Sequence, residues 1–381
     1  MSTTVENQNK ATDQKPDKTN RYPFWGPRFW HGMKMYHVFV LLWRNRFQVH
    51  PRRWSLACSV LIFSISNSLL FWIQKIIYGR RVAKTKIEHP PIFILGHWRT
   101  GTTFLHELLV RDTRFSYPTT YECFTPNHFL VSSWYMPKLV SFLMPKQRPQ
   151  DNMAAGFDRP QEDEFALCAM GAPTPYVRMA FPNRPAPYLE FLNMQGVSER
   201  DLRRFKKALL WFVRALTFRK KKQLVLKSPP HTGRIEVLAE MFPGAKFIHI
   251  VRDPYALFPS MRRTWDALDA AQGLQIRRND IDDLIFECFE RMYEGFEQQR
   301  KKIDPDCICD VRYEELTRDP IGVVESVYEA LNLGDFEPAR EKLEEFVRDQ
   351  QNYKTNRHEL DPELKEQIDR RWAGYFEKYG Y

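Results

Sequence analysis

The stretch of sequence that most constrains the fold is residues 92–110. It opens with four apolar residues in a row, 92–95, which is typical of a short buried strand. Gly96 and Gly101 then bracket a tight loop, and leucines recur at helical spacing after Thr103. A strand, a glycine loop and a helix N-terminus in this order make an anion-binding site. The N–H groups of the loop and the positive end of the helix dipole point to one place.

The loop has the spacing Gly-x4-Gly-Thr-Thr, with Thr102 at the position where a nucleotide-binding P-loop has its lysine. The positive charge lies within the loop instead, at Arg99. The loop therefore keeps a phosphate cradle but lacks the lysine that ATPases place on the β- and γ-phosphates. A P-loop kinase or NTPase stays an alternative interpretation, and the missing lysine argues against it.

Composition sets wider limits on the chain. It has 381 residues, a formal net charge of +10 and 43% hydrophobic residues, which allows one large domain or two ordinary ones. The positive charge favours an anionic partner, such as a nucleotide, an acidic glycan, a nucleic acid or an anionic membrane. The six cysteines are scattered, with neither zinc spacing nor a disulfide framework. This usage indicates a reducing compartment, and we expect a cytoplasmic protein.

Ahead of the glycine loop, the sequence predicts a polar, disordered tail at 1–20 and a helical segment at 21–85. Within that segment, residues 54–73 are twenty in a row without a charge, which is just long enough to span a bilayer. Several serines and Asn67 make the stretch polar for a spanning helix, and positive residues flank both ends. Three interpretations stay open: a spanning helix, a helix at a membrane surface, and a helix packed on the protein.

From residue 86 to 381, short apolar strands alternate with helices, and this region is predicted to be one domain. The predicted strands are 92–95, 224–226, 247–251 and 307–312, and the predicted helices include 199–217, 233–241 and 323–331. Helical crossovers between such strands predict an α/β fold, with a mostly parallel, P-loop-like sheet and helices on both faces. Ligands of such sheets bind at the carboxyl ends of the strands.

Three motifs follow three of these strands: the Arg99 loop, the segment from Lys227 to His231, and Arg252 with Ser260 eight positions later. With them the chain resembles sulfotransferases that use 3′-phosphoadenosine-5′-phosphosulfate (PAPS), of the bacterial and Golgi type with an Arg-[Ser/Thr]-Gly-Thr-Thr loop. In that family the glycine loop holds the 5′-phosphosulfate, and an Arg-x7-Ser pair holds the 3′-phosphate. The resemblance covers residues 86–381 and implies sulfuryl transfer from PAPS by in-line displacement.

The physical demands of such a donor agree with the resemblance. A nucleotide with two separated anionic ends needs two phosphate cradles on one sheet. The sulfuryl group carries less negative charge than a γ-phosphoryl group, so we expect fixed cations and loop amides to stabilise the transition state without a metal ion. The expected donor-binding residues are Arg99, Thr100, Gly101, Thr102, Thr103, Arg252, Ser260 and Tyr313, the last matching a family tyrosine near the adenine.

The resemblance also implies catalytic roles. Lys227 resembles the family lysine that reaches the sulfuryl group, and Arg99 is the first candidate for stabilising charge in the transition state. The acceptor must lose a proton, so a base is required. Glu122 is favoured, because Golgi-type and many bacterial relatives carry a glutamate base there. His231 is second, since it lies near the position of the histidine base in cytosolic relatives.

A third candidate for the base is the acidic run at residues 162–164, in which we interpret Glu162 and Asp163 as a solvated acidic patch. Lys354 and Arg357 lie where relatives place extra cations for the 3′-phosphate, and we interpret both as surface charges.

The acceptor is expected to carry a hydroxyl group or an amine, on a glycan, a lipid or a small metabolite. Residues 54–73 also allow a membrane surface as a partner. A basic membrane- or nucleic-acid-binding protein is a further alternative. However, the basic residues at 21–53 lie outside the catalytic region, so no nucleic acid partner is expected.

Overall fold

The computed structural model of the chain describes residues 22, 26–143, 155–349 and 360–381. The predicted tail at 1–20, together with Lys354 and Arg357, lies outside this part of the chain.

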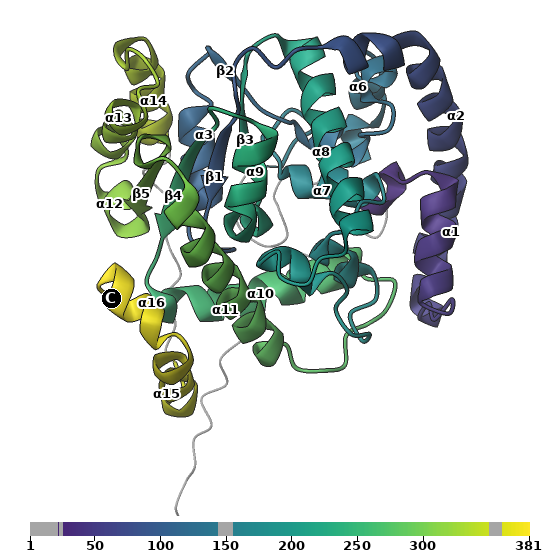
Figure 1. Cartoon of the computed structure of the whole chain (residues 1–381). Coiled ribbons are helices and arrows are strands. Elements are labelled where there is room, and N and C mark those ends of the chain that lie inside the picture. Colours follow the sequence, from purple (N-terminus) through teal and green to yellow (C-terminus); the bar gives the residue numbers. More distant parts are fainter. Residues whose placement is uncertain (1–21, 23–25, 144–154, 350–359) are drawn as a thin grey trace, which may run out of the picture.

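A parallel sheet occupies the centre of the described structure (Figure 1). Its strands are β1 (Ile92–Leu95), β2 (Phe115–Ser116), β3 (Gln223–Lys227), β4 (Lys246–Val251) and β5 (Ile308–Arg312). They lie in the order β2-β3-β1-β4-β5, and every neighbouring pair is parallel. The predicted α/β fold with a mostly parallel sheet is therefore confirmed. The strand that the sequence did not predict is β2, because two residues are too few to show a pattern.

The register of the strands brings their carboxyl ends to one edge of the sheet. Ile94 of β1 pairs with Lys227 at the end of β3, and Val251 at the end of β4 pairs with Arg312 at the end of β5. The segments that follow these strands therefore start side by side, as the alternation of strands and helices predicts.

Helices connect the strands and cover both faces of the sheet. The α-helices are α1 (Met35–Arg44), α2 (Trp54–Lys84), α3 (Thr102–Leu109), α4 (Thr120–Phe124), α5 (Phe129–Ser132), α6 (Met136–Val140), α7 (Asp163–Ala169), α8 (Glu199–Lys220), α9 (Ile235–Met241), α10 (Pro254–Gln272), α11 (Asp282–Gln299), α12 (Tyr313–Arg318), α13 (Pro320–Leu331), α14 (Glu337–Asp349), α15 (Pro362–Arg371) and α16 (Ala373–Tyr379). The 3₁₀ helices are η1 (Phe29–Gly32), η2 (Pro51–Arg53), η3 (Ser141–Leu143), η4 (Pro175–Ala180), η5 (Leu189–Leu192), η6 (Pro229–Arg234), η7 (Arg300–Lys302) and η8 (Pro305–Cys307).

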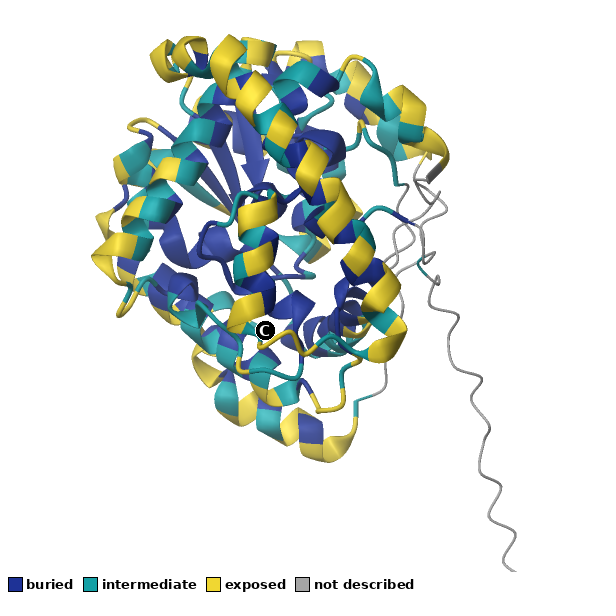
Figure 2. Cartoon of the chain, turned by 90° about the vertical axis from the view of Figure 1, so that its right-hand side faces the viewer, coloured by how far each residue is buried: buried dark blue, intermediate teal, exposed yellow. Residues whose placement is uncertain are grey.

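Side chains that alternate along the strands enter two separate cores. Phe93 and Phe247 face the core that α8, α9, α10 and α11 cover. Ile92, Ile94 and Ile248 face the core beneath α3, α13 and α14. Both faces of the sheet are thus covered, and the central strands are buried in Figure 2 while the surrounding helices alternate between buried and exposed residues. This burial on both sides explains the uninterrupted apolar runs of β1 and of the middle of β3, whereas the edge strand β5 carries the exposed Asp310.

One face of α2 packs on the rest of the protein. Its buried residues include Val60, Asn67 and Gln74, which recur at helical spacing. Asn67 Nδ2 donates to the carbonyl oxygen of Met33 at 3.0 Å, and Gln74 Nε2 donates to the carbonyl oxygen of Asn127 at 2.9 Å. These side chains fix α2 to the body of the protein by polar contacts as well as by apolar packing.

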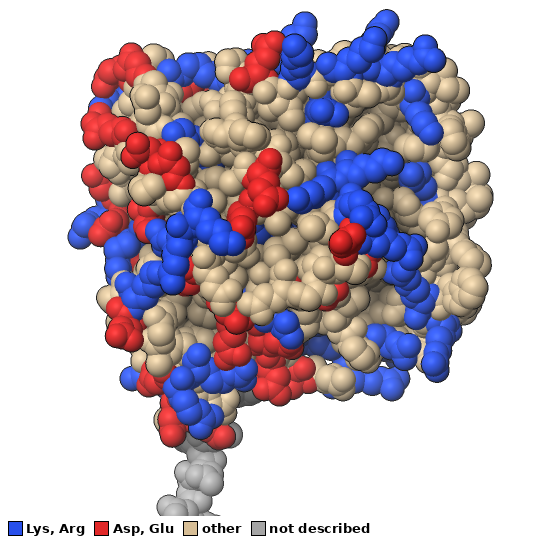
Figure 3. Space-filling view, viewed as in Figure 1, with Lys and Arg blue, Asp and Glu red and all other residues tan. Residues whose placement is uncertain are grey.

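The other face of α2 is exposed, and it carries large apolar side chains: Ile62, Ile65, Leu69, Trp72 and Ile76. In Figure 3 the right-hand edge of the molecule, where Figure 1 places α1 and α2, is mostly uncharged. By length and composition alone, the helix at 51–84 is able to cross a membrane. It extends well beyond the predicted stretch of 54–73.

We expect Asn67→Ala to lower the free energy of unfolding by about 1–3 kcal/mol, because it leaves buried polar groups without a partner. The groups that lose their partner are the carbonyls of His31 and Met33 and the ring of His128, whose Nε2 lies 3.0 Å from Asn67 Oδ1. Urea unfolding measures this change. Ser66→Ala, one residue away on the exposed face, is the matched control and should shift stability by less than about 0.5 kcal/mol. Equal stability of the two variants would contradict the packing of α2 described above.

Candidate active site

The glycine loop after β1 is a strained and closely packed turn. Gly96 and Gly101 have φ values of +144° and +100°, and Arg99 between them has φ of +72°. A side chain at Gly101 would clash with the ring of Tyr313, so glycine is required there for space as well as for conformation. The N–H of Gly96 donates to Thr232 Oγ1 at 2.7 Å. The loop is therefore packed between Tyr313 and Thr232 directly before α3 begins.

The Arg99 loop and the Arg252 motif meet in the structure. Arg99 Nε donates to Ser260 Oγ at 2.8 Å, and Arg252 Nη1 donates to the main-chain carbonyl oxygen of Arg99 at 2.8 Å. The guanidinium of Arg252 also lies 4.3 Å from the centre of the Tyr313 ring. Pro259 lies inside α10 without ending it, and the Ser260 hydroxyl still faces the loop. Four residues that the sequence predicts for donor binding thus form one cluster.

Lys227 joins the third motif to the glycine loop. Its Nζ lies 2.8 Å from Glu162 Oε1 and donates to Thr103 Oγ1 at 3.3 Å. The Lys227 side chain is only 2% exposed, whereas that of Glu162 is 12% exposed. The second carboxylate oxygen of Glu162 accepts from the hydroxyl of Tyr176, which in turn accepts from Trp98 Nε1 at 2.9 Å. This lysine is therefore directed into the protein, between a loop threonine and a carboxylate.

The interpretation of Glu162 and Asp163 as a solvated patch is wrong. Asp163 is fully buried, with Oδ2 2.6 Å from His231 Nε2, and its Oδ1 accepts from Ser228 Oγ at 2.9 Å. Burial would raise the pKa of Asp163, but the charge and hydrogen bond of His231 and the Ser228 hydroxyl hold it below its ordinary value. The sequence signal for this burial is the apolar run that follows at 165–169, which places the start of α7 in the core.

His231 is a buried partner of Asp163 in this structure. The residue has no exposed surface, and its ring packs edge-to-face on Phe93 with the centroids 5.6 Å apart. Its Nε2 lies within hydrogen-bond distance of the Asp163 carboxylate. His231, which follows Lys227 in the same motif, therefore has no contact with solvent.

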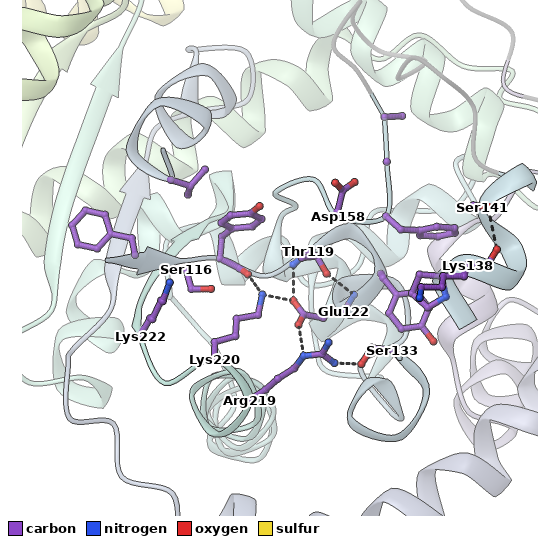
Figure 4. Close-up of a pocket in the computed structure, with 18 of the residues that line it drawn as sticks. Ser116, Thr119, Glu122, Ser133, Lys138, Ser141, Asp158, Arg219, Lys220 and Lys222 are labelled. Carbon is purple, nitrogen blue, oxygen red and sulfur yellow. Dashed lines mark hydrogen bonds and ion pairs between the residues drawn. The ribbon is translucent and has the colours of Figure 1, made fainter. Parts of the chain in front are cut away.

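Glu122 lies in a pocket of about 1050 Å³ beside β2 (Figure 4). Its Oε2 accepts from the N–H of Thr119 at 2.8 Å, in a capping box that starts α4, and lies 2.8 Å from Lys220 Nζ. Arg219 Nε approaches the other oxygen at 3.7 Å. Within the described part of the chain, the hydrogen bonds and ion pairs of this carboxylate all go to these three residues. The predicted base thus lies apart from the cluster that contains Lys227.

The assembled cluster is suited to holding and polarising an anion. The glycine loop contains the cation of Arg99, it leads into the N–H groups at the start of α3, and Lys227 contacts it through Thr103. The carboxylate of Glu162 contacts Lys227. Among residues 26–143, 155–349 and 360–381, no group of three His, Cys, Asp or Glu side chains is placed to hold a metal ion.

Comparison with known proteins gives consistent matches. A profile of the sulfotransferase family matches residues 90–338. The omega-hydroxy-beta-dihydromenaquinone-9 sulfotransferases Stf3 of Mycobacterium bovis and Mycobacterium tuberculosis are each 44% identical over 365 residues, covering 96% of this chain and 94% of the relative.

Two solved structures share the fold at low sequence identity. Sulfotransferase STF1 from Mycobacterium tuberculosis superposes with a TM-score of 0.63 at 17% identity, covering 92% of this chain and 94% of that one. Sulfotransferase STF9 from Mycobacterium avium gives a TM-score of 0.62 at 16% identity, with coverage of 91% and 96%.

We expect Asp163→Asn to flatten the acid side of the stability curve. Because the pKa of Asp163 lies below its ordinary value of 3.8, the ionised side chain stabilises the native state above about pH 4. That contribution is lost as the pH falls through the lower native pKa. The variant takes up no proton there, so its free energy of unfolding declines less steeply below about pH 4, from a starting value about 1–3 kcal/mol lower.

Urea unfolding at a series of pH values measures this slope. Asp349→Asn, at an exposed position, should keep the slope of the unmodified protein. An unchanged acid slope in Asp163→Asn would show that the Asp163 carboxylate does not contribute to stability as described.

Proposed function

The chain belongs to the sulfotransferase family and transfers a sulfuryl group, and we propose that its donor is PAPS and its acceptor is a hydroxyl group on a lipid. The observation that carries the donor assignment is the pair of hydrogen bonds through Arg99. This residue donates to Ser260 and accepts from Arg252. Two phosphate-binding motifs that are distant in the sequence are thereby joined, as a nucleotide with two anionic ends requires.

The residues fit such a donor at both ends. The N–H groups of the loop from Thr100 to Thr103, at the start of α3, would hold the 5′-phosphosulfate. Arg252 and Ser260 would hold the 3′-phosphate, and the adenine would lie near Tyr313. When bound, PAPS supplies an activated sulfuryl group on a phosphate leaving group. Arg99 and Lys227 supply fixed positive charge toward the leaving oxygen, so the proposal needs no metal ion.

The acceptor hydroxyl needs a base, and we place Glu162 in this role. Its carboxylate lies 2.8 Å from Lys227 Nζ, and its side chain keeps 12% of its surface exposed. A base has to lie within hydrogen-bond reach of the proton that it removes, and this carboxylate lies beside the group that would hold the sulfuryl. His231 is fully buried on Asp163, so we assign it a positioning role for the segment that follows β3. Glu122 stays the prediction from the family resemblance.

The lipid acceptor is supported by the relatives and by the shape of the protein. The 44% identical relatives are named for a hydroxylated dihydromenaquinone. In this chain a cavity of about 1120 Å³ lies between α1, α2 and α8. Val177 and Arg178 of η4 line this cavity, while Tyr176 of the same 3₁₀ helix contacts Glu162. We therefore propose a hydroxylated isoprenoid lipid as the substrate class, with its chain in this cavity.

We expect 3′,5′-adenosine bisphosphate to bind more tightly than ATP with Mg²⁺ in isothermal titration calorimetry. Arg252→Ala should weaken binding of the bisphosphate by about 10- to 100-fold, because it removes charge-assisted hydrogen bonds. Arg203→Ala, at an exposed position on α8, is the matched control and should leave affinity unchanged. Equal or tighter binding of ATP would contradict PAPS as the donor.

Glu162→Gln should reduce the single-turnover rate of sulfuryl transfer by about 10²–10⁴-fold while the bisphosphate affinity is kept. The acceptor for this measurement is a dihydromenaquinone with a terminal hydroxyl group, in detergent. Glu122→Gln is the matched comparison, since it makes the same change in the neighbouring pocket. If Glu122→Gln alone shows the loss, the base is the one that the family resemblance favours and our assignment of Glu162 is wrong.

A further inference from the structure

The exposed side of α1 and α2 forms one apolar surface, which we call the docking face. On α2 it consists of Ile62, Ile65, Leu69, Trp72 and Ile76, and on α1 of Met35, Tyr36, Phe39 and Trp43. On α2 these positions lie opposite the buried stripe that contains Asn67 and Gln74, since a two-residue offset is about half a helical turn. Ile62, Leu69 and Ile76 keep 68%, 64% and 80% of their surface exposed. Single exposed apolar residues are ordinary, but a continuous face of them marks an interaction surface.

The two helices that carry the docking face are packed together. The N–H of Met35 at the start of α1 donates to Ser68 Oγ of α2 at 2.9 Å. Lys34 Nζ lies 3.8 Å from the centre of the Phe71 ring, and Lys75 Nζ lies 4.6 Å from that of Trp72. These lysines lie along the aromatic rings and keep positive charge at the border of the apolar surface.

The charge of this region identifies the partner. Residues 26–87 contain eleven Lys or Arg and no Asp or Glu. In Figure 3 Lys and Arg side chains border the uncharged right-hand edge. A second copy of the chain would bring the same positive charge against this surface, whereas anionic lipid headgroups complement it. The exposed Trp43, Trp54 and Trp72 are of the type that concentrates at the boundary between headgroups and acyl chains.

A spanning orientation of α2 conflicts with its buried face. In a bilayer core, Asn67 and Gln74 would lose their bonds to the protein, and the N–H of Leu130, which donates to Gln74 Oε1 at 2.8 Å, would lose its acceptor. Unpaired polar groups in hydrocarbon are costly. The same helix lying flat keeps all of these bonds and buries only its outward face.

We propose that the docking face lies in the plane of an anionic lipid bilayer, at the boundary between headgroups and acyl chains. In this orientation the cavity behind α1 and α2 adjoins the membrane, from which a lipid acceptor would enter it. The role of the docking face in substrate entry thus rests on the proposed lipid acceptor. Binding of the docking face to a membrane, however, is measured without an enzymatic assay.

Flotation with vesicles tests the docking face directly. The full chain should bind vesicles of phosphatidylcholine with phosphatidylglycerol, bind pure phosphatidylcholine more weakly, and lose affinity as salt is raised.

Ile62→Glu with Leu69→Glu should reduce binding to the vesicles by about tenfold for each substitution, because each places a charge in the apolar boundary. Thr317→Glu with Ser326→Glu makes the same change in charge at exposed sites on α12 and α13, and it should bind as the unmodified protein does. Equal loss in both double variants would overturn the proposal.

The depth of α2 distinguishes a flat helix from a spanning one. Cys58 is exposed on α2 while the other five cysteines are buried or half-buried, so it accepts a fluorophore selectively. A second label at Leu69→Cys, in a Cys58→Ser background, marks the middle of the helix. Docking in the plane predicts that quenchers near the headgroups act on both labels. Quenching of the Leu69→Cys label only by quenchers at the bilayer centre would show that the helix spans, and would overturn the proposal.

Calorimetry with 3′,5′-adenosine bisphosphate on the same variants separates this proposal from the proposed function. Ile62→Glu with Leu69→Glu should keep the affinity for the bisphosphate, because these residues lie outside the donor site. Vesicle binding without bisphosphate binding would leave the docking face intact and refute the donor. Bisphosphate binding without vesicle binding would support the donor site and refute the docking face.

Discussion

The hydrogen bond from Arg252 to the main-chain carbonyl of Arg99 is the contact on which the site depends. It forms because β1 and β4 are parallel neighbours, so the segments after them leave the sheet side by side. The carbonyl belongs to a loop bracketed by two glycines, in which Arg99 adopts a left-handed conformation. This one bond depends on the order of the strands, on the conformation of the loop and on the position of the Arg252 side chain. Together they bring the Arg99 loop and the Arg252 motif into one cluster.

Beside this cluster, three consecutive acidic residues pair with three basic ones. Residues 162–164 contact Lys227, His231 and Arg234 in turn, at 2.8, 2.6 and 2.8 Å. Two of these pairs are fully buried, where desolvation offsets much of the attraction. Their effect is therefore on specificity more than on stability, because they fix the start of α7 against β3 and η6 in one register.

The sheet and the cluster of Arg99, Arg252, Ser260 and Tyr313 could be predicted from local sequence, whereas the burial of the acidic run at 162–164 could not. Apolar strands followed by a glycine loop, Lys227 and Arg252 reveal the architecture, because parallel strand ends always meet at one edge. Which carboxylate contacts Lys227 depends on how the intervening chain folds, and the segment around 134–185 carries little periodic pattern. The sequence therefore predicts a solvated Glu162, whereas the structure pairs it with Lys227. The polar partners of Asn67 were equally invisible, because they come from loops distant in the sequence.

The three consecutive pairs at residues 162–164 also make this part of the chain sensitive to length. A substitution at one of these positions removes one pair, and the other two still hold the segment in place. An insertion or deletion of one residue would offset all three carboxylates from their cations at once. Evolutionary change in this segment is thus expected to proceed by exchange of residues at constant spacing, while gain and loss of residues is confined to the neighbouring loops.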